Sequence, residues 1–497
     1  MFESALEKKV AAALASRDDR NTIVRLPSPP RTLGADSSVD FASGDYLSFM
    51  NTPLLRSRVL AALHAAPEIL GSGGSRFSVY NHEHATLEAR LARTFRSPAA
   101  LLFNSGFDAN AGFFACVPQP GDALLYDESI HASVHDGMRV SRVAPSMRRS
   151  FAHNNVGALR AALSALRDES ASIREGKSSV LVAVESVYSM NGTIAPLREM
   201  LDTIDEVFPA GNVHMIVDEA HATGLYGPGG RGIVALLGLE DRVFARLHTF
   251  VKALAASGGE CSYFANMWLN LPVTHSCDVD EQIDTGLFNK LRAHIHVYHF
   301  SQQYQCHCCV VLSRPSRGRH FRKGSYSHPL FCFLDPRLTS YALYSSMQKL
   351  AAQILENSTY LQERFRASAA ASSIPSHILT LYPQQQELSM KRMPSPIIPF
   401  MTPRARALSA HLLEHGLNAR PINWPGVPKG AERVRVCLHA GNTREQIDAL
   451  VDASIAWAAG IWKDEREGPE GGRTGIKESV EGVYPSGGKT FPFQSKL

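Results

Sequence analysis

Between residues 101 and 259 the sequence alternates short aliphatic or β-branched runs with longer stretches of helical periodicity. The short runs predict strands at 100–103, 123–126, 179–184, 214–217 and 247–250. The longer stretches predict helices at 110–116, 156–167 and 197–207. Strands that alternate with helices form a parallel sheet covered by helices, so the sequence predicts an α/β fold. Ligands of such sheets bind beyond the carboxyl ends of the strands, and polar residues there are the candidates for a site.

Composition excludes several other classes of protein. The 497 residues are 44% hydrophobic and 20% charged, which suits a large core and excludes a small disulfide-stapled module or a disordered chain. The 51 basic and 47 acidic residues leave a net charge of only +4, too little for a dedicated nucleic-acid binder. No apolar run reaches the roughly 18 residues of a membrane-spanning helix. We therefore expect no nucleic-acid partner and no membrane span.

The pattern also suggests how the chain is organised. A final strand is predicted at 434–438, and helices are predicted at 339–360 and 444–458. The resulting division is an N-terminal helix and arm (1–50), a large domain (51–260), an irregular segment (261–330), a helical connection (331–394), a small α+β domain (395–462) and a disordered tail (463–497).

The two ends of the sequence bear on cellular location. Glu3 and Glu7 in the first helical pattern argue against an import presequence, which is acid-poor, and no apolar stretch there suits a signal peptide. The Gly-, Glu- and Lys-rich tail ends in Ser495-Lys496-Leu497, the tripeptide read by the peroxisomal import receptor. We therefore expect a peroxisomal protein.

Asp218 and Lys252 are the sharpest candidates for chemistry. Each follows a predicted strand, and Lys252 comes 34 residues after Asp218, so both would project from one edge of the sheet. Such a pair suits pyridoxal phosphate, since a lysine forms a Schiff base with the cofactor and an aspartate keeps its pyridine nitrogen protonated. Taken singly, the aspartate could be a helix N-cap and the lysine a solvated charge.

Further motifs lie along the chain, before and after this pair. They are Asp45-Tyr46-Leu47, Gly71-Ser-Gly-Gly-Ser-Arg76, Phe103-Asn-Ser-Gly-Phe-x-Ala-Asn110, His131-Ala-Ser133, Glu185-Ser-Val-Tyr-Ser-Met-x-Gly192, Asp218-Glu-Ala-His-x-Thr-Gly224, Gly227-x-x-Gly-Arg-Gly232 and Thr249-Phe-x-Lys-Ala-Leu254. These motifs resemble those of a known family, the α-oxoamine synthases, which are fold-type-I pyridoxal-phosphate enzymes that condense an amino acid with an acyl-CoA. The resemblance implies a large, mostly parallel sheet domain, a smaller α+β C-terminal domain and a homodimer.

The resemblance implies a catalytic role for four residues. Lys252 would hold the cofactor covalently and then remove the substrate Cα proton. Asp218 would pair with the pyridinium nitrogen, and His221 would hydrogen-bond the phenolic oxygen. His131 would stack on the open face of the cofactor ring and support the oxyanion that develops on the acyl carbonyl. The alternative for His131 is a buried histidine with its hydrogen bonds satisfied.

The same resemblance implies further cofactor and substrate contacts. Ser189 would support the phenolic oxygen, and the family's small-domain motif would place Arg435 on the amino-acid carboxylate, which suits the guanidinium fork. Arg433 would lie on the same strand face and is the rival of Arg435; both could also be exposed strand charges. The phosphate would bind where strand meets helix, at Ser105, Gly106, Phe107 and Thr249.

The resemblance and the peroxisomal tripeptide together imply the substrates. Peroxisomal β-oxidation can supply pimeloyl-CoA, which the family joins to L-alanine in biotin synthesis. Serine palmitoyltransferases, expected to carry a membrane helix, and 5-aminolevulinate synthases, expected to carry a presequence, are alternatives. So are a secondary-metabolite acyltransferase, a non-catalytic family member and an aminotransferase of the same fold.

Four residues depart from the family pattern. Gly44 replaces a usual Asn and removes a side-chain contact to the substrate, Asn191 replaces an Asp, and Tyr80 replaces a Gly. Val251 replaces the small or hydroxylated residue before the lysine, where a β-branched side chain stiffens the backbone. Each change would tune specificity or mark relaxed constraint.

The segment 261–330 departs most, since its periodicity fails abruptly. One interpretation is a metal site at Cys306-His-Cys-Cys309, although this spacing matches no regular zinc signature and we expect no metal. The others are a tolerated surface insertion and an unspliced intron read in frame, which would explain the local excess of cysteine. Six of the eight cysteines lie in or beside this segment: Cys261, Cys277, Cys306, Cys308, Cys309 and Cys332.

Overall fold

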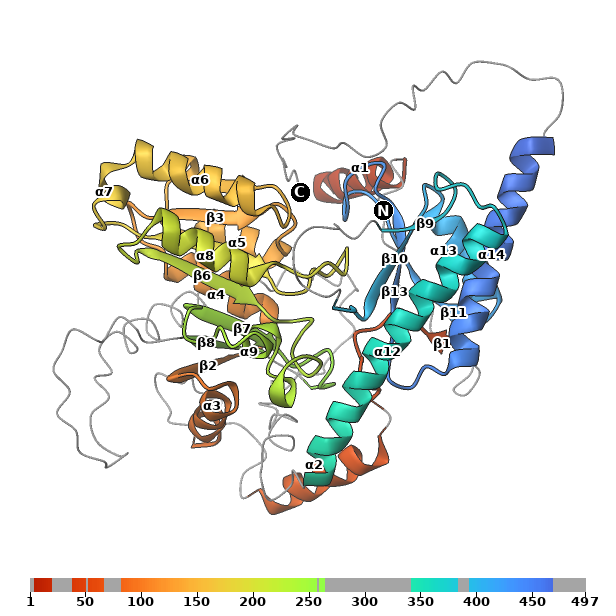
Figure 1. The fold of residues 1–497 in the computed structure, drawn as a ribbon, viewed down its shortest axis with the longest axis horizontal. Helices are drawn as coiled ribbons and strands as arrows, with labels where there is room; N and C mark the ends of the chain where they lie inside the picture. The colour runs from red at the N-terminus through yellow and green to blue at the C-terminus, as the bar shows by residue number, and fades with distance from the viewer. Residues whose placement is uncertain are drawn as a thin grey trace.

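A computed structural model describes residues 4–19, 38–50, 52–66, 82–256, 259–263, 341–382 and 393–467. The expectations for Tyr80, for the glycine run at 71–76, for most of the irregular segment and for the C-terminal tripeptide lie outside these residues. In Figure 1 the central sheet and its helices lie to the left, and the small domain, coloured blue, lies to the right.

The large domain is built on a seven-stranded sheet of order β2-β8-β7-β6-β5-β3-β4, in which only β8 is antiparallel to its neighbours. The five predicted strands are all present, each within two residues of its expected ends. The strands are β2 (Ala99–Phe103), β3 (Ala123–Asp127), β4 (Arg148–Phe151), β5 (Val180–Glu185), β6 (Val213–Asp218), β7 (Ala245–Thr249) and β8 (Gly259–Tyr263).

Strand β8 changes the expected domain boundary. It pairs with β2 on one side and β7 on the other, so residues 261–263 belong to the central sheet and the irregular segment begins later than expected. The sequence did not predict β8 because Gly-Glu-Cys-Ser-Tyr contains no aliphatic run. Strand β4 was missed for a similar reason, since Arg148 and Arg149 fill half of it.

Helices cover both faces of this sheet. Val180, Val182 and Val184 pack in one core cluster with α6 and α8, whereas Leu181 and Ala183 pack in another with α4 and α5. A strand buried on both faces reads as a continuous apolar run, which is why β5 was recognisable. The helices are α3 (His82–Phe95), α4 (Gly106–Cys116), α5 (Ala132–Val140), α6 (Val156–Glu169), α7 (Ala171–Arg174), α8 (Leu197–Val207) and α9 (Ile233–Leu236).

The small domain has a four-stranded antiparallel sheet of order β12-β13-β10-β9. Helix α14 continues to Glu467, past the expected start of the tail, and packs against α12, the long helix that precedes this domain. The elements are α12 (Tyr341–Ala371), β9 (Thr380–Leu381), β10 (Ile397–Met401), α13 (Ala405–Glu414), β11 (Leu417–Asn418), β12 (Arg420–Ile422), β13 (Arg433–Cys437) and α14 (Arg444–Glu467).

The backbone of the N-terminal arm is hydrogen-bonded to the small domain. Strand β1 (Val39–Asp40) pairs in parallel with β11. The Cys437 amide donates to the Phe41 carbonyl over 2.8 Å, and the Ala440 amide donates to the Tyr46 carbonyl over 2.7 Å. Helices α1 (Ala5–Asp19) and α2 (Pro53–Ala65) flank this arm. No helix among the described residues is long and apolar enough to cross a membrane.

Candidate active site

Three charged side chains lie at the carboxyl edge of neighbouring strands. Asp218 is the last residue of β6 and pairs with Glu185, the last residue of β5. Lys252 follows the end of β7 by three residues. Burial lowers the pKa of Lys252, while Asp218 and Glu185 oppose that effect. The structure therefore brings Lys252 and Asp218 together as the sequence predicts, and adds Glu185.

The carboxylate of Asp218 is held at both oxygens. Its Oδ1 accepts from the Ala220 amide, and its Oδ2 accepts from Asn110 Nδ2, each over 2.8 Å. Both Asp218 and Asn110 are buried. Asn110 is a positioning residue; it lies in the motif that runs from Phe103 to Asn110, but the sequence did not predict its contact with Asp218.

His221 lies buried beside the Asp218 strand end and is neutral. Burial moves its pKa well below the usual range, and the positive charges of Lys252 and Arg435 push in the same direction. Its Nδ1 lies 2.7 Å from the hydroxyl of Tyr46, which comes from the N-terminal arm. Among the described residues the other ring nitrogen, Nε2, has no hydrogen-bond partner, which leaves it for a ligand. Tyr46 was quoted in a motif but given no role by the sequence analysis.

His131 is the N-cap of α5. Its Nδ1 accepts from the Ser133 amide over 3.2 Å, so the neutral ring carries its proton on Nε2. The residue is exposed, but the protein around its ring removes part of the solvent and so lowers the pKa of His131. The negative charge of Asp218 has the opposite, smaller effect on this pKa. Phe107 contacts the ring edge-on at a centroid distance of 6.1 Å. His131 is therefore a neutral donor on the open side of the site.

The start of α4 forms an anion cradle. Ser105 caps the helix by accepting from the Asp108 amide over 3.0 Å, and the amides of Gly106 and Phe107 precede the first intrahelical bond. A Cβ on Gly106 would lie 3.0 Å from Thr249 Oγ1, so the helix start and this buried hydroxyl are packed together. Free amides, the helix dipole and a hydroxyl fit a phosphate.

The two arginines of β13, Arg433 and Arg435, have different surroundings in the structure. Arg433 is 2% exposed and donates to the backbone carbonyls of Ala431 and Met190 and to Asn191 Oδ1. Arg435 makes a long bond, 3.4 Å, to the Ser189 carbonyl and a side-chain hydrogen bond to the Cys437 thiol, and its buried Nε has no hydrogen-bond partner among the described residues. Arg435 is therefore the arginine with unused donors beside His221 and Lys252, and neither residue is an exposed strand charge.

The departures from the family pattern have distinct surroundings. A Cβ on Gly44 would lie 3.2 Å from Lys252 Cγ, so this glycine packs closely against the lysine and a side chain here would crowd it. Asn191 is the large-domain partner of Arg433. Val251 is 52% exposed and points away from the core. Ser189 is buried, and its carbonyl faces Arg435.

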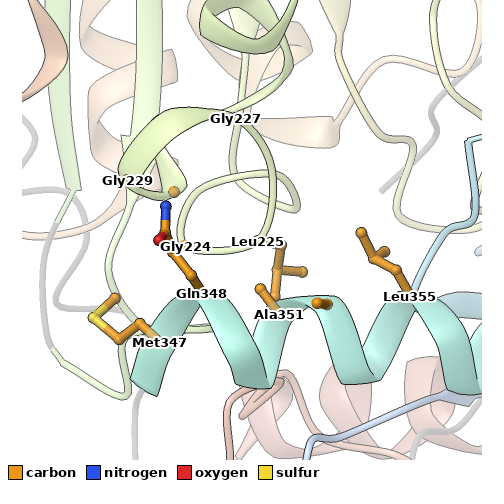
Figure 2. A pocket seen from close by; sticks show the side chains of 10 residues that line it. Gly224, Leu225, Gly227, Gly229, Met347, Gln348, Ala351 and Leu355 are labelled. Atoms are coloured by element: carbon orange, nitrogen blue, oxygen red, sulfur yellow. The ribbon is translucent and has the colours of Figure 1, made fainter. Parts of the chain in front are cut away.

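A cavity of about 230 Å³ lies between the glycine-rich loop after Asp218 and helix α12. Figure 2 shows Met347, Gln348, Ala351 and Leu355 of α12 facing this loop. The loop touches the residue after the lysine, since a Cβ on Gly224 would lie 2.8 Å from that of Ala253. The predicted site residues do not line it. Among the described residues no group of His, Cys, Asp and Glu is arranged to hold a metal ion.

The fold and the site together define a fold-type-I pyridoxal-phosphate enzyme. The donor set fits the cofactor: an amine, a fixed carboxylate, a neutral histidine and a helix N-terminus lie at one sheet edge. The sequence profile of the family "aminotransferase class I and II" matches residues 36–302 and 331–453. The chain belongs to this family and, within it, to the α-oxoamine synthases, which are pyridoxal-phosphate-dependent acyltransferases.

Similar proteins include two fungal enzymes. An 8-amino-7-oxononanoate synthase of Emericella nidulans is 36% identical over 465 residues, which cover 91% of this chain and 96% of that protein. The aminoacyl transferase sphA of Aspergillus fumigatus is 34% identical over 90% of this chain and 86% of its own. These comparisons confirm the predicted family, cofactor and enzyme class.

Solved structures confirm the predicted fold class. Serine palmitoyltransferase of Sphingomonas wittichii has a TM-score of 0.64 at 22% identity and covers 93% of this chain and 99% of its own. An 8-amino-7-oxononanoate synthase of Francisella tularensis has a TM-score of 0.54 at 20% identity, over 86% of this chain and 99% of its own.

Within the irregular segment, the family profile leaves only residues 303–330 unmatched.

Proposed function

We propose that this enzyme joins pimeloyl-CoA and L-alanine, the reaction of an 8-amino-7-oxononanoate synthase. The observation that carries an acyltransferase reaction is that Arg435 of the small domain lies near Lys252 and His221, which stand with Asp218 at the carboxyl edge of the large sheet. The choice of substrates is supported by the 36% identity to the Emericella enzyme over nearly the whole of both chains.

The residues of the site divide the chemistry between them. Pyridoxal phosphate, when bound, supplies an electron sink for the carbanion at the substrate Cα. Lys252 would hold it and then take the Cα proton, which is easier because burial lowers the pKa of its amine. Asp218, fixed by Asn110, would keep a proton on the pyridine nitrogen.

The substrate would be bound from two sides. Arg435 offers its guanidinium to the amino-acid carboxylate, and a bidentate pair would orient the Cα proton toward Lys252. His131, with its proton on Nε2, would donate to the thioester carbonyl oxygen as negative charge develops there. Burial of His221 and Lys252 keeps water from competing for these bonds.

Two measurements test this proposal. The cofactor-loaded protein should show an absorbance band near the visible edge that is lost in Lys252→Ala, and absence of the band in the unaltered enzyme would refute the cofactor role of this lysine. Turnover of pimeloyl-CoA with L-alanine should exceed that of palmitoyl-CoA with serine. Equal or reversed rates would refute the substrate assignment while leaving the acyltransferase class intact.

A second candidate is an acyltransferase with another acyl or amino-acid substrate. The 34% identity to the sphA aminoacyl transferase is close to that of the first relative. Gly44, which stands where the family usually has an asparagine, also packs directly against Lys252, so the surroundings of the lysine differ from the family pattern. A panel of acyl-CoA chain lengths against alanine, serine and glycine would favour this candidate if a pair other than pimeloyl-CoA and alanine has the highest kcat/KM.

We also propose a peroxisomal homodimer. The tripeptide Ser495-Lys496-Leu497 supports import, and a fluorescent fusion should enter peroxisomes with the tripeptide and stay outside without it. Sedimentation of the purified enzyme should give about twice the chain mass of 54.3 kDa. A diffuse fusion protein would contradict the proposed address, and a monomer would contradict the proposed dimer.

For residues 303–330, a retained intron and a tolerated insertion remain the proposals. Sequencing of the messenger RNA distinguishes them, because a message that lacks these codons favours the intron and a uniform message that contains them favours the insertion.

A further inference from the structure

Tyr46 connects the two domains at the cofactor site. Its backbone belongs to the N-terminal arm, which hydrogen-bonds to the small domain through the Tyr46 carbonyl and the Ala440 amide. Its side chain is 1% exposed and reaches into the large domain, where the hydroxyl lies 2.7 Å from His221 Nδ1. This contact is a side-chain hydrogen bond between the arm and the Asp218–His221 motif.

The bond has a defined direction. Burial raises the pKa of the Tyr46 hydroxyl well above its usual range, so the hydroxyl keeps its proton. His221 is neutral, and the groups that face it, Lys252, Arg435 and His131, are all positive or become so on protonation. A neutral imidazole has one donor and one acceptor nitrogen. A hydroxyl that donates to Nδ1 therefore leaves the proton on Nε2.

The opposite arrangement, in which His221 Nδ1 donates to the Tyr46 oxygen, is less favourable. If Nδ1 donated to the tyrosine oxygen, the hydroxyl proton would need another acceptor. The neighbouring group on the small domain is the buried thiol of Cys437, whose hydrogen bond with Tyr46 is weak because sulfur accepts poorly.

We propose that Tyr46 is a positioning residue that fixes the Nε2–H form of His221 and so makes this histidine a donor to the cofactor's phenolic oxygen. Because the arm is bound to the small domain, Tyr46 can fix the proton of His221 on Nε2 only when the arm and both domains are packed together. The role concerns the cofactor site of the family and does not depend on which acyl-CoA is the substrate.

The variant Tyr46→Phe tests the proposal because it removes one oxygen atom. A donor to the phenolic oxygen stabilises its deprotonated form, so losing the donor raises the pH at which the spectrum of the lysine-bound cofactor changes. From the net worth of one hydrogen bond, the expected rise is about 0.4–1 pH unit. The cofactor dissociation constant should rise by about 2- to 10-fold.

Tyr226→Phe is a matched control. Tyr226 is also buried, and its hydroxyl also donates over 2.7 Å, but to the Pro394 carbonyl. This variant should lose thermal stability without moving the spectral transition. The second control is a double-mutant cycle with His221→Ala, in which Tyr46→Phe should cause no further shift, because Tyr46 acts through His221.

Two results would overturn the proposal. One is a shift of the spectral transition in Tyr46→Phe no larger than that in Tyr226→Phe, and the other is a shift that adds in full to that of His221→Ala.

Nitrogen-15 NMR of the histidine-labelled enzyme is a second test, independent of how Tyr46→Phe folds. The His221 resonances, assigned by their loss in His221→Ala, should show an unprotonated Nδ1, and a protonated Nδ1 would refute the assignment. Neither readout involves turnover, so the result is separate from the choice of substrate.

Discussion

Replacing Arg433 and Arg435 separately by methionine should produce two different defects. Methionine keeps an unbranched side chain and removes only the charge and the donors. Arg435→Met should raise the KM for the amino acid, because it removes the guanidinium that would bind the carboxylate. Arg433→Met should lower stability, because the guanidinium of Arg433 is already fully used within the protein.

The magnitudes follow from the contacts. Removing one partner of a buried, hydrogen-bonded charge pair costs about 2–5 kcal/mol, so the KM of Arg435→Met should rise by about 30-fold to several thousand-fold. Its bond to the Ser189 carbonyl is 3.4 Å long and its other protein hydrogen bond goes to the Cys437 thiol, a weak acceptor, so both contribute little to folding. Arg433→Met leaves three oxygen acceptors without their donor, which costs about 3–5 kcal/mol and lowers the Tm by about 5–10 °C.

Steady-state kinetics with varied amino acid, together with thermal unfolding, measure both effects. The lysine variant of each residue adds a check, since Arg435→Lys keeps the charge but loses the bidentate fork and should recover only part of the KM. If Arg433→Met raises the KM at an unchanged Tm while Arg435→Met leaves the KM unchanged, the assignment of the two arginines is reversed and the reasoning fails.

Three further predictions concern the residues that support the site. Asn110→Ala should weaken cofactor binding by about tenfold, because it removes a hydrogen bond to a charged carboxylate, and an unchanged absorbance titration would contradict this. Gly232→Ala should cost about 2–4 kcal/mol, because the φ of +97° is strained and a Cβ would lie 2.6 Å from the Glu219 carboxylate. Gly238→Ala, with φ +63° and no atom near its Cβ, should cost less than half as much free energy of unfolding. Urea unfolding of both variants measures the difference. Burial and nearby Asp218 raise the pKa of Glu185 well above 4.5, so its stabilising effect is complete below pH 4.5 and is lost as the pH rises through the folded pKa. Glu185→Gln should therefore flatten the decline of Tm toward alkaline pH, and parallel curves for the two proteins would rule this out.

Elements with a strong local pattern were predictable from the sequence. Strand β5 is buried on both faces and reads as a nearly continuous apolar run, and the motifs that follow β6 and β7 placed Asp218 and Lys252 on one sheet edge. The strands that were missed owe their structure to neighbours. Strand β8 contains Gly, Glu, Cys, Ser and Tyr, and it forms because β2 and β7 offer hydrogen bonds on both sides.

The partners of the site residues were less predictable than the residues themselves. Asn110 reaches Asp218 across 108 positions, and Tyr46 reaches His221 across 175 positions, so neither contact leaves a local signal. The choice between Arg433 and Arg435 also needed the structure, because strand alternation gives both residues the same face. The positions of Met190 and Asn191 show that Arg433 is the arginine whose donors are already used within the protein.

The place of β8 in the sheet has a consequence for how this chain folds. Because β8 lies between β2 and β7, the first strand of the sheet joins the others only after residue 263 has been synthesised. A Cβ on Gly259 would lie 2.7 Å from the Gly106 amide, so this late strand also supports the start of α4. Until then, β2 has contacts with its sequence neighbours α3 and α4 but no strand beside it, and strand pairing over such a long sequence separation is a slow step in folding. The ribosome must therefore pass the whole cofactor motif before the phosphate cradle exists.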